Sequence, residues 1–434
     1  MKIIAEIKVF SKKQIFDIKK YGTLELFRKF NILIRILIRI PIDIIAVASC
    51  LIIRLVKPWL VVRIQKVPAG NFGDFVEVIG IYYCKKKLKI DKLTNKHLDL
   101  FYIHHKDKIF NKQLAKMWKR KMIFLSSYLL DPIYRINKLI PGWKNHIINI
   151  SDKRDIDNLF EKCKVLDFTA EEEIYGKKML NKFGLKDGDK FVCLAVSDSA
   201  YHLKKIPARY RDWSYHNFRH TNIDNFILAA EELAKIGYYV FRMGVVVEKL
   251  FNSKNPKIID YANSNLRSDF MDIYLGAKCS FCIATSYGFQ SVPCLFGKPL
   301  IDISSPIGDM CTHNEKYLLM TKHHILKKEK RKLSLSEIFF YGVAQAHDTK
   351  TFEQKGIELV DNTPEEIKDI VLEMVESLEA KKKLNQYDEE LQKNFKSLYD
   401  SNIKNYQPNY GKFHRQIKSR FGTKFLRENK NWLK

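Results

Sequence analysis

The stretch Ile258–Ser305, IIDYANSNLRSDFMDIYLGAKCSFCIATSYGFQSVPCLFGKPLIDISS, decides the fold of this chain. It carries two strand-like runs, Cys279–Ala284 and Pro299–Ile303, and a short helix-like run, Phe289–Phe296, between them. A strand, a turn and a helix N-terminus leave several backbone N–H groups unpaired around one point, which suits a phosphate. The stretch therefore predicts a parallel α/β sheet with an anion site at the turn Thr285–Gly288.

Strand and helix patterns alternate on both sides of this stretch. Apolar runs at 190–196 and 238–243 are typical of strands, and the run 223–235 between them has helical periodicity. Capping boxes at Thr169–Glu172 and Thr363–Glu366 open two further helices, and Ser268 can cap the helix that follows it. A β-loop-α pattern begins near residue 61, and the run Met122–Leu129 is strand-like. Because 434 residues exceed one typical core, we expect two doubly wound, Rossmann-like domains. The predicted parts are 1–60, a basic and apolar segment; 61–165, a first α/β domain; 166–362, a second; and 363–434, helices with a basic tail.

The charge balance favours an anionic partner. The chain carries 76 Lys and Arg against 49 Asp and Glu, a net charge of +27. Such a surplus suits nucleic acid, acidic lipid or phosphorylated substrates, although an AT-rich genome also enriches lysine. The positive charge is spread along the chain and no nucleic-acid module is recognisable, so we do not expect nucleic acid as the partner.

Cysteine usage indicates a reducing compartment. Cys279 and Cys282 form a lone CxxC inside a strand-like run, without the second ligand pair that a zinc site needs. We therefore expect buried, reduced thiols, no metal site and a cytoplasmic protein.

The most apolar region, Ile32–Ile64, is flanked by basic residues. Its apolar centre, Ile40–Ile53, contains Pro41 and Asp43 and is shorter than the ~20 residues that span a bilayer. The pattern fits a helix lying in the plane of an anionic membrane, with Trp59 at the interface. A helix packed against its own domain is the alternative. We see no secretory signal in the first residues.

Basic and aromatic residues meet in a long loop after the strand 190–196. The loop, Asp198–Arg219, suits a diphosphate beside a stacked base, and also single-stranded nucleic acid or a solvated surface. Arg242 and Gly244 end the next strand, which places them at the carboxyl edge of the predicted sheet. Asp74 lies in the glycine turn GNFGD and is either a general base or a turn aspartate.

The run Asn222–Pro299 resembles a bacterial family of surface-carbohydrate glycosyltransferases. The matching words are NIDNFILAAEELAKIGYYVFRMG, IIDYANS, RSDFMDIYL and ATSYGFQSVPCLFGKP, and the likeness extends to Asp99–Trp118 and GIELVDNTPEEI. Members are similar to GT-B enzymes, in which two Rossmann-like domains face a cleft, with the donor in the C-terminal domain. The resemblance implies an α/β, GT-B-like fold of this kind.

The resemblance also implies site residues. It places Thr285, Ser286 and Gly288 on the donor diphosphate with Gln290 nearby. It places Arg211, Arg219 and Arg242 in the donor cleft, beside Gly244. The acceptor-side loop is similar to that of heptosyltransferase-like enzymes, in which an aspartate is the base; here it comprises Gly70, Asn71, Gly73 and the candidate base Asp74. This chain departs from the family pattern at His220, where an Asn is expected, and in the acceptor loop itself, where a Gly-His turn is expected.

The sequence thus predicts a metal-independent glycosyltransferase without a cofactor, acting at the inner face of the plasma membrane. It would move a sugar from a nucleotide-diphosphate sugar to a cell-surface glycan or a lipid-linked acceptor. Three alternatives stay open: a sugar-nucleotide epimerase-like enzyme on the same fold, a basic nucleic-acid-binding protein, and an inactive relative that only binds glycans.

Overall fold

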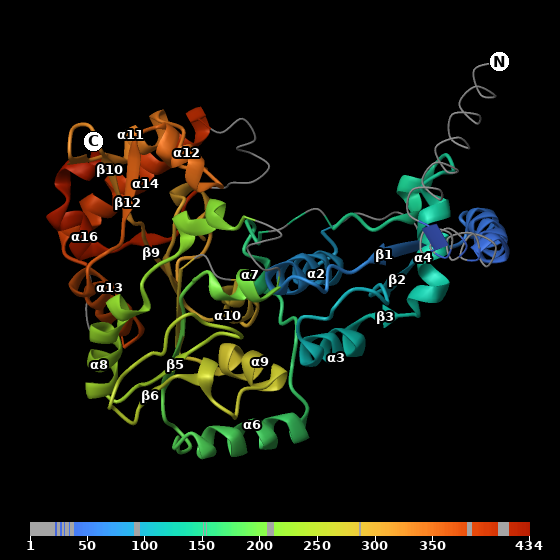
Figure 1. The fold of residues 1–434 in the computed structure, drawn as a ribbon, viewed down its shortest axis with the longest axis horizontal. Coiled ribbons are helices and arrows are strands. Elements are labelled where there is room, and N and C mark those ends of the chain that lie inside the picture. The colour runs from blue at the N-terminus through green and yellow to red at the C-terminus, as the bar shows by residue number, and fades with distance from the viewer. Residues whose placement is uncertain are drawn as a thin grey trace. The chain divides into compact units, whose positions relative to one another are not determined.

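The computed structural model is a mixed α/β protein (Figure 1), as the sequence predicts. It describes residues 39–90, 96–150, 152, 154–205, 212–285, 288–379, 384–406 and 416–434, together with 22, 23, 27, 30 and 34. The chain forms two compact units. Unit 1 comprises Met1–Val67, Leu93–Asp107 and Met122–Asn149; unit 2 comprises Pro68–Lys92, Lys108–Lys121 and Ile150–Lys434. The four-part division with a boundary at residue 165 stays a prediction.

Unit 2 is built on a seven-stranded sheet in which every neighbouring pair is parallel. Its strand order is β13-β9-β8-β7-β4-β5-β6. The strands are apolar and buried on both faces, as parallel sheets require. Their bounds are β4 Phe191–Ala195, β5 Tyr239–Arg242, β6 Ile258–Ile259, β7 Phe281–Ala284, β8 Leu300–Ile303, β9 Tyr317–Met320 and β13 Arg420–Phe421.

The strand order reverses direction between β4 and β7. From β4 the chain moves outward through β5 to β6, then returns to β7 and continues outward through β8 and β9. Because parallel crossovers are right-handed, this reversal puts the helices of the two halves on opposite faces. Helices α8 and α13 lie on one side of the sheet and α9 and α10 on the other (Figure 1). The helices of unit 2 that shape the site are α2 Phe72–Lys87, α3 Lys112–Lys121, α7 Ala200–Lys205, α8 Ile227–Lys235, α9 Asp269–Lys278, α10 Ser291–Leu295 and α13 Pro364–Leu378.

Local capping signals fix several helix starts. Thr169 and Thr363 form capping boxes with Glu172 and Glu366, which begin α6, Ala170–Lys182, and α13. Ser268 caps α9 by accepting a hydrogen bond from the N–H of Met271. These three starts agree with the sequence-based expectation.

The C-terminal segment completes the large sheet and its core. Arg420 and Phe421 pair with β9 as an added edge strand, and Phe421 and Trp432 pack against helix α14 through Phe395. The predicted basic tail is therefore an integral part of unit 2. The remaining elements are α5 Leu159–Lys162, β10 His323–Leu326, β11 Arg331–Lys332, α11 Leu335–Phe340, α12 Thr349–Gln354, β12 Ile357–Val360, α14 Gln386–Tyr406 and α16 Thr423–Glu428.

Unit 1 contains a parallel three-stranded sheet, β1-β2-β3. Its strands are β1 Val61–Lys66, β2 His97–Tyr102 and β3 Ile123–Phe124, and helix α4 spans Ser127–Asn137. The strand expected over 122–129 is much shorter than predicted, because Ser126 accepts the N–H of Tyr128 and starts α4. Residues 39–55 form a helix that buries Ala46 and Cys50 against α4 and β1. Among the described residues, no helix combines the length and the apolar character needed to cross a bilayer.

Candidate functional site

A cavity of about 340 Å³ opens at the carboxyl edge of the large sheet, and every described residue that lines it belongs to unit 2. Its walls include Ser197 and Asp198 after β4, Met243 after β5 and Gly288 after β7. Strands β4 and β7 are the neighbours at which the strand order reverses. Open α/β sheets bind ligands in the crevice at this position. The cavity therefore lies where the sheet topology predicts a ligand site.

The ends of β4 and β7 are joined by Thr285. Its hydroxyl accepts a hydrogen bond from the N–H of Ser197 at 2.8 Å, and its own N–H donates to Ala195 at 3.1 Å. Thr285 is buried and does not line the cavity. Its side chain thus links the ends of β4 and β7 and does not face the cavity.

Two glycines bring the N-terminus of α2 against the short turn of 3₁₀ helix Gly288–Gln290. A Cβ atom on Gly288 would lie 3.4 Å from the N atom of Gly73, and one on Gly73 would lie 3.8 Å from the Cα atom of Gly288. Both distances are those of ordinary van der Waals contact, so the two backbones lie close together but a small side chain would also fit. The glycine turn of the predicted acceptor loop and that of the predicted donor site are therefore neighbours in one wall of the cavity.

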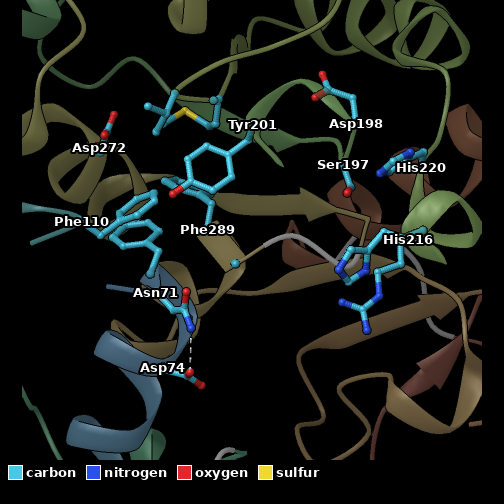
Figure 2. A pocket seen from close by; sticks show the side chains of 17 residues that line it. Asn71, Asp74, Phe110, Ser197, Asp198, Tyr201, His216, His220, Asp272 and Phe289 are labelled. Atoms are coloured by element: carbon cyan, nitrogen blue, oxygen red, sulfur yellow. Dashed lines mark hydrogen bonds between the residues drawn. The ribbon is translucent and has the colours of Figure 1, made fainter. Parts of the chain in front are cut away.

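Asp74 lies in the first turn of α2 and lines the cavity. Its Oδ2 atom accepts a long hydrogen bond, 3.3 Å, from Nδ2 of Asn71, as the dashed line in Figure 2 shows. A carboxylate in this position is favoured by the positive end of the helix dipole. Asp74 is therefore held at the cavity wall.

One end of the cavity carries an arginine and two histidines. Arg219 lines it together with His216 and His220, and Figure 2 shows the two histidines on the same side of the pocket. Among the described residues the Arg219 guanidinium has no hydrogen-bond or ion-pair partner, and its Nε atom is buried. Burial lowers the pKa of this group, while Asp309 acts in the opposite direction. An arginine stays protonated in proteins, so Arg219 is a partly desolvated cation that a bound anion would stabilise.

The other end of the cavity is aromatic. Phe72 stacks on Phe110 with ring centroids 4.9 Å apart, and Phe110 contacts Tyr201 at 5.7 Å. Phe289 adjoins Phe72 at 6.4 Å. Figure 2 shows Phe110, Tyr201 and Phe289 grouped on the side away from the histidines. Flat apolar faces of this kind accept a planar base or the C–H face of a sugar ring.

Asp272 gives the cavity wall a buried carboxyl group. Tyr261 donates to its Oδ1 atom at 2.9 Å, and Arg267 pairs with Oδ2 at 2.7 Å. Burial raises the pKa of Asp272 to about 6, and the Arg267 charge limits this rise. Arg267 also donates to the carbonyl oxygen of Gly244 at 3.0 Å. This network fixes the loop after β5, which lines the cavity.

The structure brings six of the predicted site residues to the cavity. They are Asn71, Gly73, Asp74, Arg219, Gly244 and Gly288. Gly70, Arg242, Thr285 and Gln290 lie outside the lining, and Arg211 and Ser286 fall outside the described residues. Gln290 donates to the sulfur of Cys311 at 3.5 Å.

Arg242 has a structural environment. It is 1% exposed and pairs with Asp260 at 3.3 Å and with Asp198 at 3.8 Å. Asp198 itself lines the cavity, so Arg242 supports the wall from behind. Its role as a direct donor contact stays a prediction.

The site residues that the sequence did not single out are mostly apolar. Phe72, Phe110 and Phe289 come from three distant segments, and none of them has a local pattern that distinguishes it from a core residue. His216 lies in the loop Asp198–Arg219, and the basic and aromatic residues of that loop already indicated a ligand site. Among the described residues, no group of three or more His, Cys, Asp or Glu side chains is arranged to hold a metal ion.

A buried carboxyl group behind the cavity makes unit 2 sensitive to pH. Glu77 of α2 accepts a hydrogen bond from the Ser291 hydroxyl of α10 at 2.7 Å. Burial raises its pKa from 4.5 to about 7, and the Ser291 bond opposes this rise. The folded state therefore binds this proton more tightly than the unfolded state. The stability of unit 2 should fall as the pH rises from 4.5 to above 7.

Glu77→Gln should remove this dependence. We expect a flatter plot of unfolding free energy against pH, with the variant more stable than the parent above pH 7. Urea unfolding at several pH values measures both, and the exposed Glu389→Gln is the matched control. Identical slopes in parent and Glu77→Gln would contradict the assignment.

Comparison with known proteins gives likeness in structure only. No family model and no curated protein matches the chain. The chain is similar to the E. coli ADP-heptose LPS heptosyltransferase II, with 12% identity, a TM-score of 0.38, and coverage of 74% of this chain and 99% of that one. It is similar to a glycosyl transferase family 9 structure from Veillonella parvula, with 10% identity, a TM-score of 0.40, and coverage of 74% and 97%.

A third similar structure is the E. coli heptosyltransferase WaaC with ADP-2-deoxy-2-fluoro heptose. The identity is 9%, the TM-score is 0.29, and the coverage is 60% of this chain and 93% of that one. With TM-scores below 0.5 and identities of 12% or less, these likenesses concern the fold alone. What the chain does has to be inferred from the residues of its cavity.

Proposed function

We propose that this protein is a glycosyltransferase that takes a sugar from a nucleoside-diphosphate sugar. The observation that carries the proposal is the cavity at the β4–β7 reversal. It joins an aromatic wall to Arg219, which is half-buried and has no hydrogen-bond or ion-pair partner among the described residues. Two negative charges and a flat ring system, held a few ångströms apart, are the features of a nucleoside diphosphate. A cavity of about 340 Å³ is within the usual range for small-molecule sites.

The diphosphate would occupy the basic end of the cavity. Arg219 can offer two parallel N–H donors to phosphate oxygens. Charge builds up on the diphosphate as it leaves the sugar. Fixed donors in a dry site stabilise that charge, so we propose that they do so in place of a metal ion.

The aromatic end would hold either the base or the transferred sugar. Phe72, Phe110, Tyr201 and Phe289 offer stacking faces, and Asp272 offers a carboxyl group on the same side of the pocket (Figure 2). Stacking selects for a ring, and polar edge contacts select which ring it is. This division gives the site both affinity and specificity.

Asp74 is the group best placed to act as the base. The acceptor O–H would transfer its proton to the Asp74 carboxylate while the oxygen bonds to the anomeric carbon. The bond between that carbon and the diphosphate oxygen breaks, and its electron pair leaves with the diphosphate. We propose that the acceptor is a surface glycan or a lipid-linked saccharide, in keeping with the sequence-based prediction.

A panel of nucleoside diphosphates tests the proposal. UDP, GDP, ADP, CDP and dTDP are each added to the full chain at millimolar concentration, and the melting temperature is measured. At ~100 times Kd, a ligand that binds only the folded state stabilises it by about 2.7 kcal/mol, which is a shift of several degrees. No shift with any of the five would count against the proposed function.

We also propose that unit 1 carries the protein to an anionic membrane surface. The helix 39–55 leaves a broad apolar face in solvent, with Ile44 64% and Leu55 73% exposed, and Trp59 beyond it is 74% exposed. Arg39, Arg54 and Lys57 lie along the same segment. Apolar residues beside basic ones suit an in-plane contact with anionic lipid.

Flotation with liposomes tests this localisation. The triple variant Ile44→Ser, Leu51→Ser and Leu55→Ser should lose most flotation with anionic vesicles, because each change removes exposed apolar area and no core contact. Leu139→Ser, another exposed leucine of unit 1, is the control. Equal flotation of parent and triple variant would refute the membrane contact.

A further inference from the structure

Three rings stack at the carboxyl edge of the unit 1 sheet. His104 and His105 follow β2, and Tyr128 follows β3 in the first turn of α4. The ring centroids lie 4.4 Å apart for His104 and His105 and 4.7 Å apart for His105 and Tyr128, with interplanar angles of 29° and 19°. Tyr128 ends the stack and is 72% exposed. A flat aromatic face is thus open to solvent at the kind of sheet edge that binds ligands.

Hydrogen bonds fix the two imidazole rings. Ser127 Oγ accepts the backbone N–H of His105 at 3.1 Å and lies 3.3 Å from the Nδ1 atom of that ring. The backbone N–H of Lys106 donates to Nδ1 of His104 at 3.2 Å. With Nδ1 accepting, a neutral ring carries its hydrogen on Nε2. Among the described residues, Nε2 of His105 has no partner, so it can donate to or accept from a ligand, according to the tautomer of the ring.

Carboxylates lie beside the same stack. Asp131 Oδ2 lies 4.0 Å from Nε2 of His104, and Asp131 also accepts from Tyr102 at 3.1 Å and Arg135 at 3.1 Å. These bonds hold the carboxylate in place while part of it stays exposed. The platform therefore combines a stacking face, a ring N–H donor and a fixed acceptor.

We propose that His104, His105 and Tyr128 form a platform that binds a pyranose ring of a saccharide. One face of such a ring is lined with C–H groups, which pack on an aromatic face, and its hydroxyl groups project sideways to polar partners. Because the rings are already fixed, little side-chain entropy is lost on binding. The choice of a saccharide rests on the proposed glycosyl transfer.

A lipid surface is the competing occupant, since Tyr128 has the exposed apolar neighbours Leu125 and Leu129. Lipid contact depends on apolar area and gains nothing from imidazole rings held by hydrogen bonds. It also gains nothing from a fixed carboxylate such as Asp131, which anionic headgroups repel. The stacked and hydrogen-bonded geometry therefore favours the saccharide.

Saturation-transfer NMR on the full chain tests the platform. The probes are the methyl glycosides of glucose, galactose, mannose, N-acetylglucosamine and glucuronic acid at millimolar concentration. At least one should receive saturation, strongest at ring C–H protons of one face. Tyr128→Ala and His105→Ala should each reduce that signal at least threefold, and His105→Phe should restore part of the His105→Ala loss because it keeps a stacking face.

The controls separate this platform from the cavity of unit 2. Tyr175→Ala removes an exposed tyrosine of unit 2, and Arg219→Met alters the cavity; both should keep the full sugar signal. Loss of signal in Arg219→Met would show that the sugar binds in the cavity, which overturns the platform and leaves the proposed function standing. No saturation with any probe, or a Tyr128→Ala variant that loses only vesicle flotation, would overturn it as well.

Discussion

Arg219→Met should lower the affinity for the preferred nucleoside diphosphate about 100-fold while leaving the protein at least as stable as the parent. Two charge-assisted hydrogen bonds to phosphate contribute roughly 3 kcal/mol, which corresponds to that factor. The guanidinium is partly desolvated and, among the described residues, has the Phe218 ring as a neighbour but no hydrogen-bond or ion-pair partner, so its removal costs the empty protein no ion pair. Calorimetric titration measures the affinity, and thermal unfolding without ligand measures the stability.

Arg219→Lys is the matched variant for this prediction. It keeps the charge but loses the planar pair of donors, so the affinity should fall less than in Arg219→Met, by about tenfold. Arg120→Met is a control outside the cavity, since Arg120 pairs with Glu172. Unchanged diphosphate affinity in Arg219→Met would remove Arg219 from the site.

Arg242→Met should destabilise unit 2 by about 3–5 kcal/mol. Arg242 is almost fully buried at the end of β5, where it pairs with Asp260 and Asp198. Without Arg242, the carboxylates of Asp260 and Asp198 stay largely buried with no cation to pair with them. Their desolvation is what lowers the free energy of unfolding. Any loss of nucleotide affinity should follow from movement of Asp198 at the cavity wall.

Urea unfolding of parent and variant measures this loss of stability. The double variant Arg242→Met with Asp260→Asn should recover part of it, because one of the stranded charges is then absent. If Arg242→Met proved as stable as the parent but lost diphosphate binding, Arg242 would be a ligand contact, as the sequence first suggested, and the ion pairs would not matter. The contrast with Arg219→Met separates a binding arginine from a supporting one.

Much of the fold could be predicted because its signals are local. The strands β4, β5, β7 and β8 stand within a residue or two of the apolar runs that predicted them, and Thr169, Thr363 and Ser268 cap the helices expected of them. The run 122–129 was predicted as a strand because it is mostly apolar. Ser126 caps α4, however, so the strand ends at Phe124.

The site was less predictable because it depends on contacts between distant segments. Arg219 and Gly288 could be chosen from their places after strands, since the carboxyl edge of a parallel sheet gathers such residues. Thr285 and Arg242 occupy equivalent places, yet their side chains bind Ser197 and two aspartates instead of facing the cavity. Local sequence does not show which way such a side chain points.

The aromatic wall shows the same limit more clearly. Phe110 meets Phe72 and Tyr201 only after α2, α3 and α7 have packed, and before that each looks like an ordinary core residue. The close approach of Gly73 to Gly288 likewise depends on tertiary packing, although the glycine in each turn indicated that another group could come close to the backbone there.

Hydrogen–deuterium exchange with the nucleoside diphosphate that stabilises the chain most is the most direct test of the central claim, that the unit 2 cavity binds this group. Peptides that contain 197–201, 216–220, 243–245 and 288–290 should exchange more slowly with the ligand, and this protection should disappear in Arg219→Met. Protection confined to the groove lined by residues 331–334 and 427–432, with none at the carboxyl edge of the large sheet, would contradict it.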